Sequence, residues 1–325
     1  MRLRATVAGL LVALAAPAAA RADALLPPAG HAFTGLSGST SAAAFTAATG
    51  KAPAIFGVFV GWGSSDEYAF RAAESVGARL MLHVSTGGYG APEVITPLDI
   101  ARGHGDGYLL HLNARLAQEH APTYVRLLAE MNQANNDYCA FDRDGRYRGR
   151  AHSTQSFKQA WRRATLIIRG GSVATIDARL QGLHLPPVAT TATVLPKPQV
   201  AMAWVPQTAG SPDIPANSAQ AYWPGARYVD WVGTDFYSRF PGWTGLERFY
   251  AEHPTKPFLF GEWALWGRDD PAFVEHLFAW MSSHRRVRME LYNQGRPGGP
   301  FRLSRYPRGA AALRSALRDP RWLGG

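Results

Sequence analysis

The chain has 325 residues, of which 46% are hydrophobic and 18% are charged, which is the composition of a globular protein with room for one large domain or two ordinary ones. The formal charge of +10 comes from scattered basic residues with short clusters at 143–150 and 284–288. No basic motif interleaved with aromatic residues occurs, which argues against a nucleic-acid partner but leaves attraction to an acidic polymer open. Cys139 is the only cysteine, which excludes an internal disulfide, and no histidines pair at ligand spacing, so we predict no metal site.

The first 22 residues have the pattern of a secretory signal peptide. Arg2 and Arg4 precede the apolar run ATVAGLLVALAAPAAA, and a small-x-small cleavage site follows at residues 20–22. We therefore expect a secreted protein, extracellular or periplasmic, whose mature chain begins near Asp23. The alternative is a membrane anchor, but the run is short and rich in alanine for a bilayer span, and no later stretch qualifies as one.

Eight short apolar runs, most of which end in a polar or aromatic residue, predict eight β-strands. They cover residues 31–36, 55–62, 79–85, 123–132, 199–206, 228–237, 256–263 and 287–294. Their nearly continuous hydrophobicity is typical of parallel strands that are covered on both faces. Helical periodicity between them predicts helices over residues 66–76, 107–120, 156–169 and 272–284.

The alternation of strand and helix predicts a single (β/α)8 barrel domain, a TIM barrel, over residues 23–325. The alternative is an open doubly wound sheet, which usually carries a glycine-rich phosphate turn after its first strand, and VGWGSSDE does not match that turn. Two segments depart from the alternation. Residues 133–152 read as a long polar loop, and residues 170–198 can form an extra hairpin.

Polar and aromatic side chains gather at the C-terminal ends of the predicted strands, where (β/α)8 enzymes place their chemistry. These residues are Trp62, His83, Glu130, Asn132, Trp204, Gln207, Asp235, Tyr237, Glu262, Trp263, Asn293 and Gln294. Glu130 and Glu262 each end an apolar strand. Such a pair can cleave a glycosidic bond when one carboxyl group is protonated and the other is ionised. The structural alternative is that each glutamate is only an ion-pair partner.

The neighbours of the two glutamates fit a glycosidase cleft. Arg126 lies four residues before Glu130, so on a strand the two side chains share a face, and Arg126 can reach the carboxylates or simply neutralise Glu130. Tyr237 is a candidate hydroxyl donor to the nucleophile. The other candidate substrate ligands are Trp62, His83, Asn132, Trp204, Asp235 and Trp266. Each has a structural alternative: a core or rim histidine, a helix-capping aspartate, or a core tryptophan.

Several stretches also match one known enzyme family. They include GHGDGYLLHLNARLAQ, YVRLLAEMN, AWRRATLIIR, VAMAWVPQ, YWPGARYVDWVGTDFY and KPFLFGEWA, and together the match spans roughly residues 55–295. YVRLLAEMN resembles the R-P-x-H-E-M-N signature of glycoside hydrolase family 26. YWPGARYVDWVGTDFY, the most specific stretch, resembles Y-Y-P-G-x-x-Y-V-D-W-V-G-x-D-x-Y of the same family. The resemblance implies that Glu130 is the acid/base and Glu262 the nucleophile of a retaining mechanism, with Tyr237 beside the nucleophile.

The sequence departs from the family pattern near both glutamates. Ala129 stands where the family usually has histidine, Leu127 replaces proline, and Ala264 replaces glycine. Residues 133–141 lack the usual Gly-x-Trp, and the insertion at 170–198 is unlike the compact family pattern. The histidine and the tryptophan position substrate in the family, so the departures bear on specificity.

We therefore predict a secreted, monomeric, retaining and endo-acting β-glycoside hydrolase that needs no cofactor. The resemblance implies a β-linked polysaccharide or oligosaccharide substrate, typically mannan and sometimes mixed-linkage glucan or xylan. Ala129 and the altered loop favour an alternative, a non-catalytic glycan-binding barrel of the cell envelope. A third possibility is an envelope interaction protein that uses its basic surface.

Overall fold

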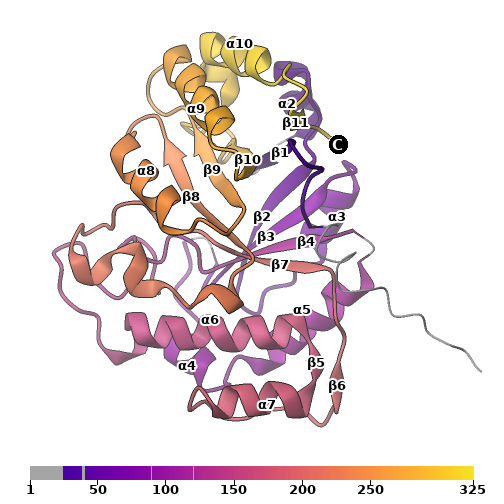
Figure 1. Cartoon of the computed structure of the whole chain (residues 1–325), viewed down its shortest axis with the longest axis vertical. Coiled ribbons are helices and arrows are strands. Elements are labelled where there is room, and N and C mark those ends of the chain that lie inside the picture. The colour runs from indigo at the N-terminus through magenta and orange to yellow at the C-terminus, as the bar shows by residue number, and fades with distance from the viewer. Residues whose placement is uncertain (1–24, 39–40, 89, 120) are drawn as a thin grey trace, which may run out of the picture.

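Eight parallel strands close into a barrel in the computed structural model (Figure 1), which describes residues 25–38, 41–88, 90–119 and 121–325. The strands are β1 Ala32–Ser37, β2 Ile55–Gly61, β3 Arg79–Ser85, β4 Thr123–Leu127, β7 Val200–Trp204, β8 Trp231–Tyr237, β9 Phe258–Ala264 and β10 Val287–Asn293. Strand β1 pairs in parallel with both β2 and β10, so the ring has no open edge. This closed ring confirms the predicted (β/α)8 barrel and excludes the alternative, an open doubly wound sheet. The expected signal peptide lies outside the described residues.

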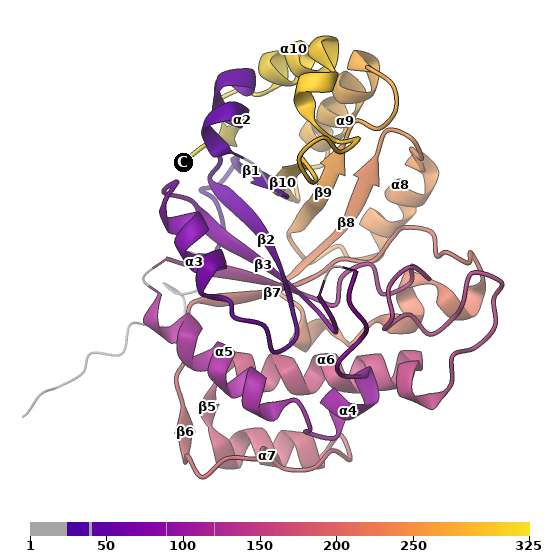
Figure 2. The same ribbon diagram turned by 180° about the vertical axis from the view of Figure 1, so that it is seen from behind.

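Helices surround the barrel. They are α2 Ala42–Thr49, α3 Glu67–Glu74, α4 Pro97–Ala101, α5 Asp106–Gln118, α6 Thr154–Arg169, α7 Val173–Gln181, α8 Trp243–Glu252, α9 Pro271–Ser283 and α10 Pro307–Ala316. Short 3-10 turns are η1 Arg150–His152, η2 Pro215–Asn217, η3 Ala219–Tyr222, η4 Ala226–Tyr228 and η5 Leu303–Arg305. In Figures 1 and 2, α4 to α7 gather on one side of the barrel and α8 to α10 on the other. Within the described residues, no helix is both long and apolar enough to span a bilayer.

The two irregular segments have different structures. Residues 170–198 hold β5 Gly171–Ser172 and β6 Val194–Leu195, which pair antiparallel and enclose α7, so the expected hairpin exists but is built around a helix. Residues 133–152 contain only η1 and follow β4 as the expected long loop. A two-residue strand, β11 Trp322–Leu323, pairs with the start of β1 at the opposite end of the barrel from its mouth.

Alternate residues of each strand face two different cores. The interior of the barrel is filled by a small cluster that includes Phe33, Ile55, Met81, Tyr124, Ala201, Ala203, Val205, Trp231, Leu259, Met289 and Leu291. The other face of each strand packs on the helices in a much larger cluster. Because side chains alternate along a strand, this division decides which strand-end residues can reach the barrel mouth.

Glu290 is a buried carboxyl group on the helix-facing side of β10. It is fully inaccessible, and it accepts hydrogen bonds from the hydroxyl of Thr34 and from the indole of Trp263, whose Nε1 lies 2.5 Å from Oε2. Burial raises the pKa of Glu290 to about 7, although both hydrogen bonds oppose that shift. The folded protein therefore holds a proton that the unfolded chain releases at lower pH.

We expect Glu290→Gln to remove a pH-dependent part of the stability. The contribution of Glu290 is most favourable below about pH 4.5 and is lost as the pH rises through about 7. The variant should therefore gain free energy of unfolding relative to the wild type over this range, on the order of 3 kcal/mol, since one pKa unit corresponds to about 1.4 kcal/mol. Urea unfolding at a series of pH values measures this difference. The exposed Glu74→Gln on α3 is the control, and a difference that stays flat with pH contradicts the prediction.

Candidate active site

A β-bulge in β9 aims Glu262 into the barrel mouth. Phe260 pairs with Thr234 of β8, but Glu262 pairs with the very next residue, Asp235, so Gly261 is an extra residue. Such bulges change the direction of a side chain at the end of a strand. A Cβ atom on Gly261 would lie 2.9 Å from Oδ1 of Asp235 and 3.1 Å from Nε of Arg126. Only glycine therefore leaves room for those two side chains above the bulge.

The guanidinium of Arg126 joins two carboxylates at the centre of the mouth. Arg126 is on β4 and only 2% exposed; its Nη1 contacts Oε1 of Glu262 on β9, and its Nη2 contacts Oδ2 of Asp235 on β8. The second oxygen of Glu262 accepts hydrogen bonds from the Tyr237 hydroxyl, at 2.6 Å, and from the amide of Asn293. Both oxygens of Glu262 are thus held in one orientation, so the opening into the barrel carries a fixed carboxylate.

The predicted strand over 123–132 is too long, because β4 ends at Leu127. Glu130 therefore lies in the turn that follows β4 and not on the strand. Leu128 and Glu130 have positive φ angles of 45° and 53°, a conformation that side chains other than glycine rarely adopt. The N–H of Leu128 donates to the carbonyl of Val84 at 2.8 Å, and the N–H of Glu130 donates to Val205 at 2.7 Å. The chain after β4 is thus fixed between the ends of β3 and β7, and this turn presents Glu130.

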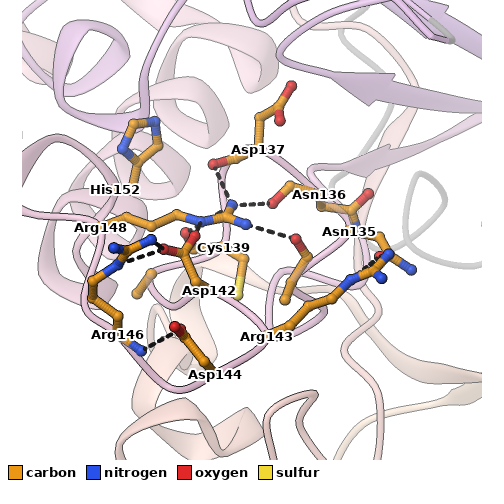
Figure 3. Close-up of polar contacts among 12 residues, drawn as sticks. Asn135, Asn136, Asp137, Cys139, Asp142, Arg143, Asp144, Arg146, Arg148 and His152 are labelled. Atoms are coloured by element: carbon orange, nitrogen blue, oxygen red, sulfur yellow. Dashed lines mark hydrogen bonds and ion pairs between the residues drawn. The ribbon is translucent and has the colours of Figure 1, made fainter.

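The loop at 133–152 supports this turn. Asn136 donates its side-chain amide to the carbonyl of Glu130 at 3.0 Å, and the buried Tyr138 donates its hydroxyl to the carbonyl of Ala129 at 2.6 Å. Figure 3 shows Arg148 at the centre of the loop. Its guanidinium donates to the carbonyls of Ala134, Asn136, Asp137 and Cys139 and pairs with Asp142 at 2.7 Å. The segment that lacks the family's Gly-x-Trp therefore holds the backbone of Glu130.

Among the described residues, no cation forms an ion pair with the carboxyl group of Glu130. The amide of Gln207 donates to Oε1, and Gln207 is in turn held by Asn132, whose side chain makes two 2.9 Å hydrogen bonds with the Gln207 backbone. Burial raises the pKa of Glu130, and the nearby charge of Glu262 raises it further, while contacts with the Asp235 carboxyl, Arg126 and Gln207 oppose the shift. Burial also raises the pKa of Asp235 well above its usual range, so Glu130 and Asp235 together form a buried carboxyl pair that is prepared to share a proton.

A cavity of about 480 Å³ opens on the β2–β3 side of the carboxyl cluster. Its lining includes Phe59, His83, Ser85, Thr86, Gly87, Gly88, Asn135, Asn136, Asp137 and Tyr138. His83 pairs in register with Arg126, and its ring lies 5.0 Å from that of Phe59. Burial, reinforced by the charge of Arg126, lowers the pKa of His83 well below its usual range, so the ring is neutral and can exchange hydrogen bonds with a polar ligand.

Aromatic side chains form the opposite rim. Trp266 is half-buried, and its ring lies 5.9 Å from that of Tyr237, 5.6 Å from Phe240 and 5.2 Å from Phe301. Phe240 is 67% exposed. We name Phe240 and Trp266 the aromatic rim. Because Tyr237 also contacts Glu262, the aromatic rim begins one side chain away from the fixed carboxylate.

Three predicted substrate ligands are not available to a substrate. Trp204 is fully buried on the helix-facing side of β7, and Trp62 is 8% exposed with its ring 4.7 Å from that of Tyr108. Both predictions were wrong because Val205 and Gly61, and not the two tryptophans, occupy the inward-facing positions at these strand ends. Asn132 is fully buried and its side chain holds Gln207, so it positions another residue.

The other predicted residues lie at the mouth in two groups. Arg126 and Asp235 are buried against each other, and Asp235 caps no helix. His83 lines the cavity on one side, and Tyr237 and Trp266 lie together on the opposite rim. Gln207 and Asn293, which the sequence placed only among the polar strand ends, contact the two glutamates directly. Their position one step beyond an apolar run is the same signal that identified the glutamates.

A closed (β/α)8 barrel places its functional groups at its C-terminal mouth, and here that mouth carries a cluster of carboxyl groups. No protein-family model and no curated protein sequence matches the chain. Among solved structures, GH26A from Muricauda sp. MAR_2010_75 is 15% identical over 94% of this chain and 95% of that chain, with a TM-score of 0.60. A Cellulomonas fimi endo-β-1,4-mannanase is 16% identical over 94% of this chain and 75% of that chain, also at 0.60.

A third neighbour is the GH26 domain of a Prevotella bryantii endo-β-mannanase/endo-β-glucanase, 14% identical over 96% of both chains, with a TM-score of 0.54. The similarity covers nearly the whole chain in each case, so no large part of the barrel is unmatched. At these identities the similarity is one of fold. The resemblance to glycoside hydrolase family 26 is confirmed at that level.

We expect Gly261→Ala to disturb the site and the fold together. The added methyl group meets Asp235 and Arg126 at about 3 Å, and neither buried side chain can move without breaking an ion pair. Such overpacking should lower the free energy of unfolding by about 1–3 kcal/mol, as measured by urea denaturation. Gly107→Ala is the matched control, because its Cβ has open space within helix α5. Equal stability of Gly261→Ala and the wild type would show that the bulge is not tightly packed.

Proposed function

We propose that the chain is a secreted, retaining β-glycoside hydrolase and a divergent relative of family 26, with Glu130 as the acid/base and Glu262 as the nucleophile. The supporting observation is the contrast between the two carboxyl groups. Glu262 is held at both oxygens by Arg126, Tyr237 and Asn293. Glu130 lies outside the ion pairs of Arg126, accepts a hydrogen bond from the neutral amide of Gln207, and has a raised pKa. Two carboxyl groups whose environments separate their protonation states are what glycoside hydrolysis needs.

The two groups would act in sequence. Glu130 transfers its proton to the glycosidic oxygen while Oε of Glu262 attacks the anomeric carbon, so the leaving chain departs with a new hydroxyl group and a glycosyl ester forms on Glu262. Glu130, now ionised, then takes a proton from water, and the water oxygen displaces Glu262 from the same carbon. Each step inverts the carbon, so the product keeps its configuration. We expect the two carboxyl groups to lie about 5 Å apart in the complex, as retention requires.

The surrounding residues would position the nucleophile. Arg126 neutralises Glu262 and fixes its rotation, and Asp235 in turn fixes Arg126 from the neighbouring strand. The Tyr237 hydroxyl holds the other oxygen at 2.6 Å and can release it when that oxygen becomes part of the ester. These groups stay in place through the reaction, so little reorganisation is needed in the transition state.

The substrate we propose is a β-linked polysaccharide that lies across the mouth, from the cavity beside His83 to Trp266 and Phe240. Candidate binding groups on both sides of the carboxyl cluster, the cavity beside His83 and the aromatic rim, favour cleavage within a chain. The Cellulomonas fimi neighbour is an endo-β-1,4-mannanase, and a termite-symbiont β-mannanase neighbour binds a gluco-manno-oligosaccharide, so β-mannans and glucomannans are the first substrates to test. Secretion rests on the signal-like residues 1–22, and we expect a monomer.

One observation favours a glycan-binding barrel without turnover. Ala129 is buried and its carbonyl is occupied by Tyr138, so nothing at that position replaces the histidine that the family places beside the acid/base. Binding of a glycan without release of new reducing ends would support this second function.

Replacement of each glutamate tests the roles separately. Glu130→Gln and Glu262→Gln should each lower the release of reducing ends from β-glycans by about 10² to 10⁴-fold. With an aryl glycoside that has a good leaving group, Glu130→Gln should still show a burst of phenol, because glycosylation no longer needs the acid, whereas Glu262→Gln should show none. The exposed Glu275→Gln on α9 is the control. Wild-type rates in both variants would refute the proposal.

Gln207→Met tests the electrostatics of Glu130. The amide of Gln207 donates to the Glu130 carboxylate and so favours its ionised form, which lowers its pKa. Without that donor the pKa rises, and the alkaline limb of the kcat/KM profile should move to higher pH while the acidic limb stays in place. Rates measured across the pH range on a soluble substrate decide this. An alkaline limb that stays unchanged or moves to lower pH would show that Glu130 does not control it.

A further inference from the structure

The rim above β8, β9 and β10 is rich in arginine. Three loops leave the C-terminal ends of these strands, at residues 238–242, 265–270 and 294–302, and they carry Arg239, Arg268, Arg296 and Arg302. The only acids in these loops are Asp269 and Asp270, and both are engaged. Asp269 accepts the N–H groups of Arg308, at 3.0 Å, and Gly309, at 2.7 Å. Asp270 caps α9 and pairs with Arg268 at 2.7 Å.

Three of these arginines lack a counter-ion. In the part of the chain that the structure describes, no carboxylate pairs with Arg239, Arg296 or Arg302. A group of unpaired cations around an open cleft attracts anions and concentrates a ligand of opposite charge. The chain is basic overall, and at the mouth its unpaired positive charge is concentrated on one side.

Arg239 is the cation that lies on the aromatic rim. Its guanidinium carbon is 5.2 Å from the centre of the Trp266 ring and 5.6 Å from that of Phe240. Arg239 is exposed, and among the described residues its N–H groups make no hydrogen bond to another residue. The rings keep the guanidinium in place through cation–π attraction, and its five donors stay free. The paired N–H donors of the planar guanidinium match the geometry of the oxygens of a carboxylate or a sulfate.

The opposite side of the mouth has no cation among the residues that line its cavity. Asn135, Asn136, Asp137 and the neutral His83 form its polar part. In Figure 3 the Asp137 carboxylate points away from Arg148, which contacts only the backbone carbonyl of Asp137. An anionic group would be repelled there and attracted at the aromatic rim. The two sides of the mouth are therefore electrostatically different.

We propose that the aromatic rim is a subsite for an acidic sugar, which stacks on Trp266 and places its anionic substituent against Arg239. This inference rests on the proposed function for the scissile bond beside Glu262, and it names the substrate class as an acidic β-linked polysaccharide. A neutral sugar needs only the aromatic faces, whereas an unpaired guanidinium on those faces adds a donor set that only an anion fully uses. The anion is a carboxylate or a sulfate ester, since both offer paired oxygens.

Binding and cleavage should be measured separately. Titration calorimetry on the Glu262→Gln background, in which cleavage is removed, compares three probes of one length: β-1,4-mannohexaose, its C6-oxidised uronate form and its sulfated form. We expect an anionic form to bind more tightly than the neutral one, and added salt to reduce that preference. Arg239→Gln should weaken binding of the anionic form by about ten-fold, with little change for the neutral form. Arg239→Lys should recover part of the loss, because it keeps the charge without the paired donors.

Arg179→Gln on α7 is the matched control, an exposed arginine far from the mouth (Figure 1), and should leave every affinity unchanged. Stronger binding of the uronate or of the sulfated form identifies the substituent and supports the subsite. Equal affinity for neutral and anionic probes, or no effect of Arg239→Gln, overturns it. If mannan is cleaved but Arg239→Gln leaves the affinity for both anionic probes unchanged, the subsite fails and the hydrolase stands. If the acidic probe binds through Arg239 but the wild-type protein releases no reducing ends from it or from mannan, the hydrolase fails and the subsite stands.

Discussion

The buried guanidinium of Arg126 is the constraint on which the rest of the mouth depends. A lone cation with 2% exposure would be strongly unfavourable, so its two carboxylate partners must be present and correctly aimed. Those partners come from β8 and β9, across the barrel from β4, so the ion pairs hold distant parts of the ring together. Removing one partner would leave a buried charge and destabilise the fold by about 3–5 kcal/mol. The stability of the barrel and the orientation of Glu262 therefore depend on the same contacts.

Glu130 lies outside this rigid arrangement, and the backbone there has its own constraint. Two residues with left-handed φ angles cost about 1–3 kcal/mol each, and such strain persists only when the surroundings fix it. Here the surroundings are two hydrogen bonds to the ends of β3 and β7, together with Asn136 and Tyr138 from the following loop. The result is an asymmetric pair: one carboxyl group is fixed by the charge of Arg126, and the other is positioned by its backbone and by neighbouring polar side chains.

The sequence predicted the barrel well because eight apolar runs separated by helical periodicity fit few other architectures. It also predicted that both glutamates lie at the barrel mouth, since each carboxyl group directly follows an apolar run, and their catalytic roles remain a prediction. It could not decide which strand-end side chains face inward. Trp204 and Val205 are adjacent and apolar, and only the pairing register shows that Val205 points into the barrel. At Glu262 the simple alternation fails because Gly261 forms a bulge, which depends on contacts to Arg126 and Asp235 from other strands.

The departures from the family pattern that lie around the carboxyl cluster leave its centre intact. Ala129, and the loop without the usual tryptophan, change what surrounds Glu130. Yet Asn136 and Tyr138 of that loop hold the turn at Ala129 and Glu130, so the replaced segment still positions Glu130. Aromatic contact has instead been provided on the far side, by Phe240 and Trp266, together with a free guanidinium. The centre of the mouth can change little because a buried ion pair tolerates no partial replacement, whereas exposed loops can exchange charge at low cost. A divergent member of such a fold should therefore differ in the sugar that it binds before it differs in the bond that it cleaves.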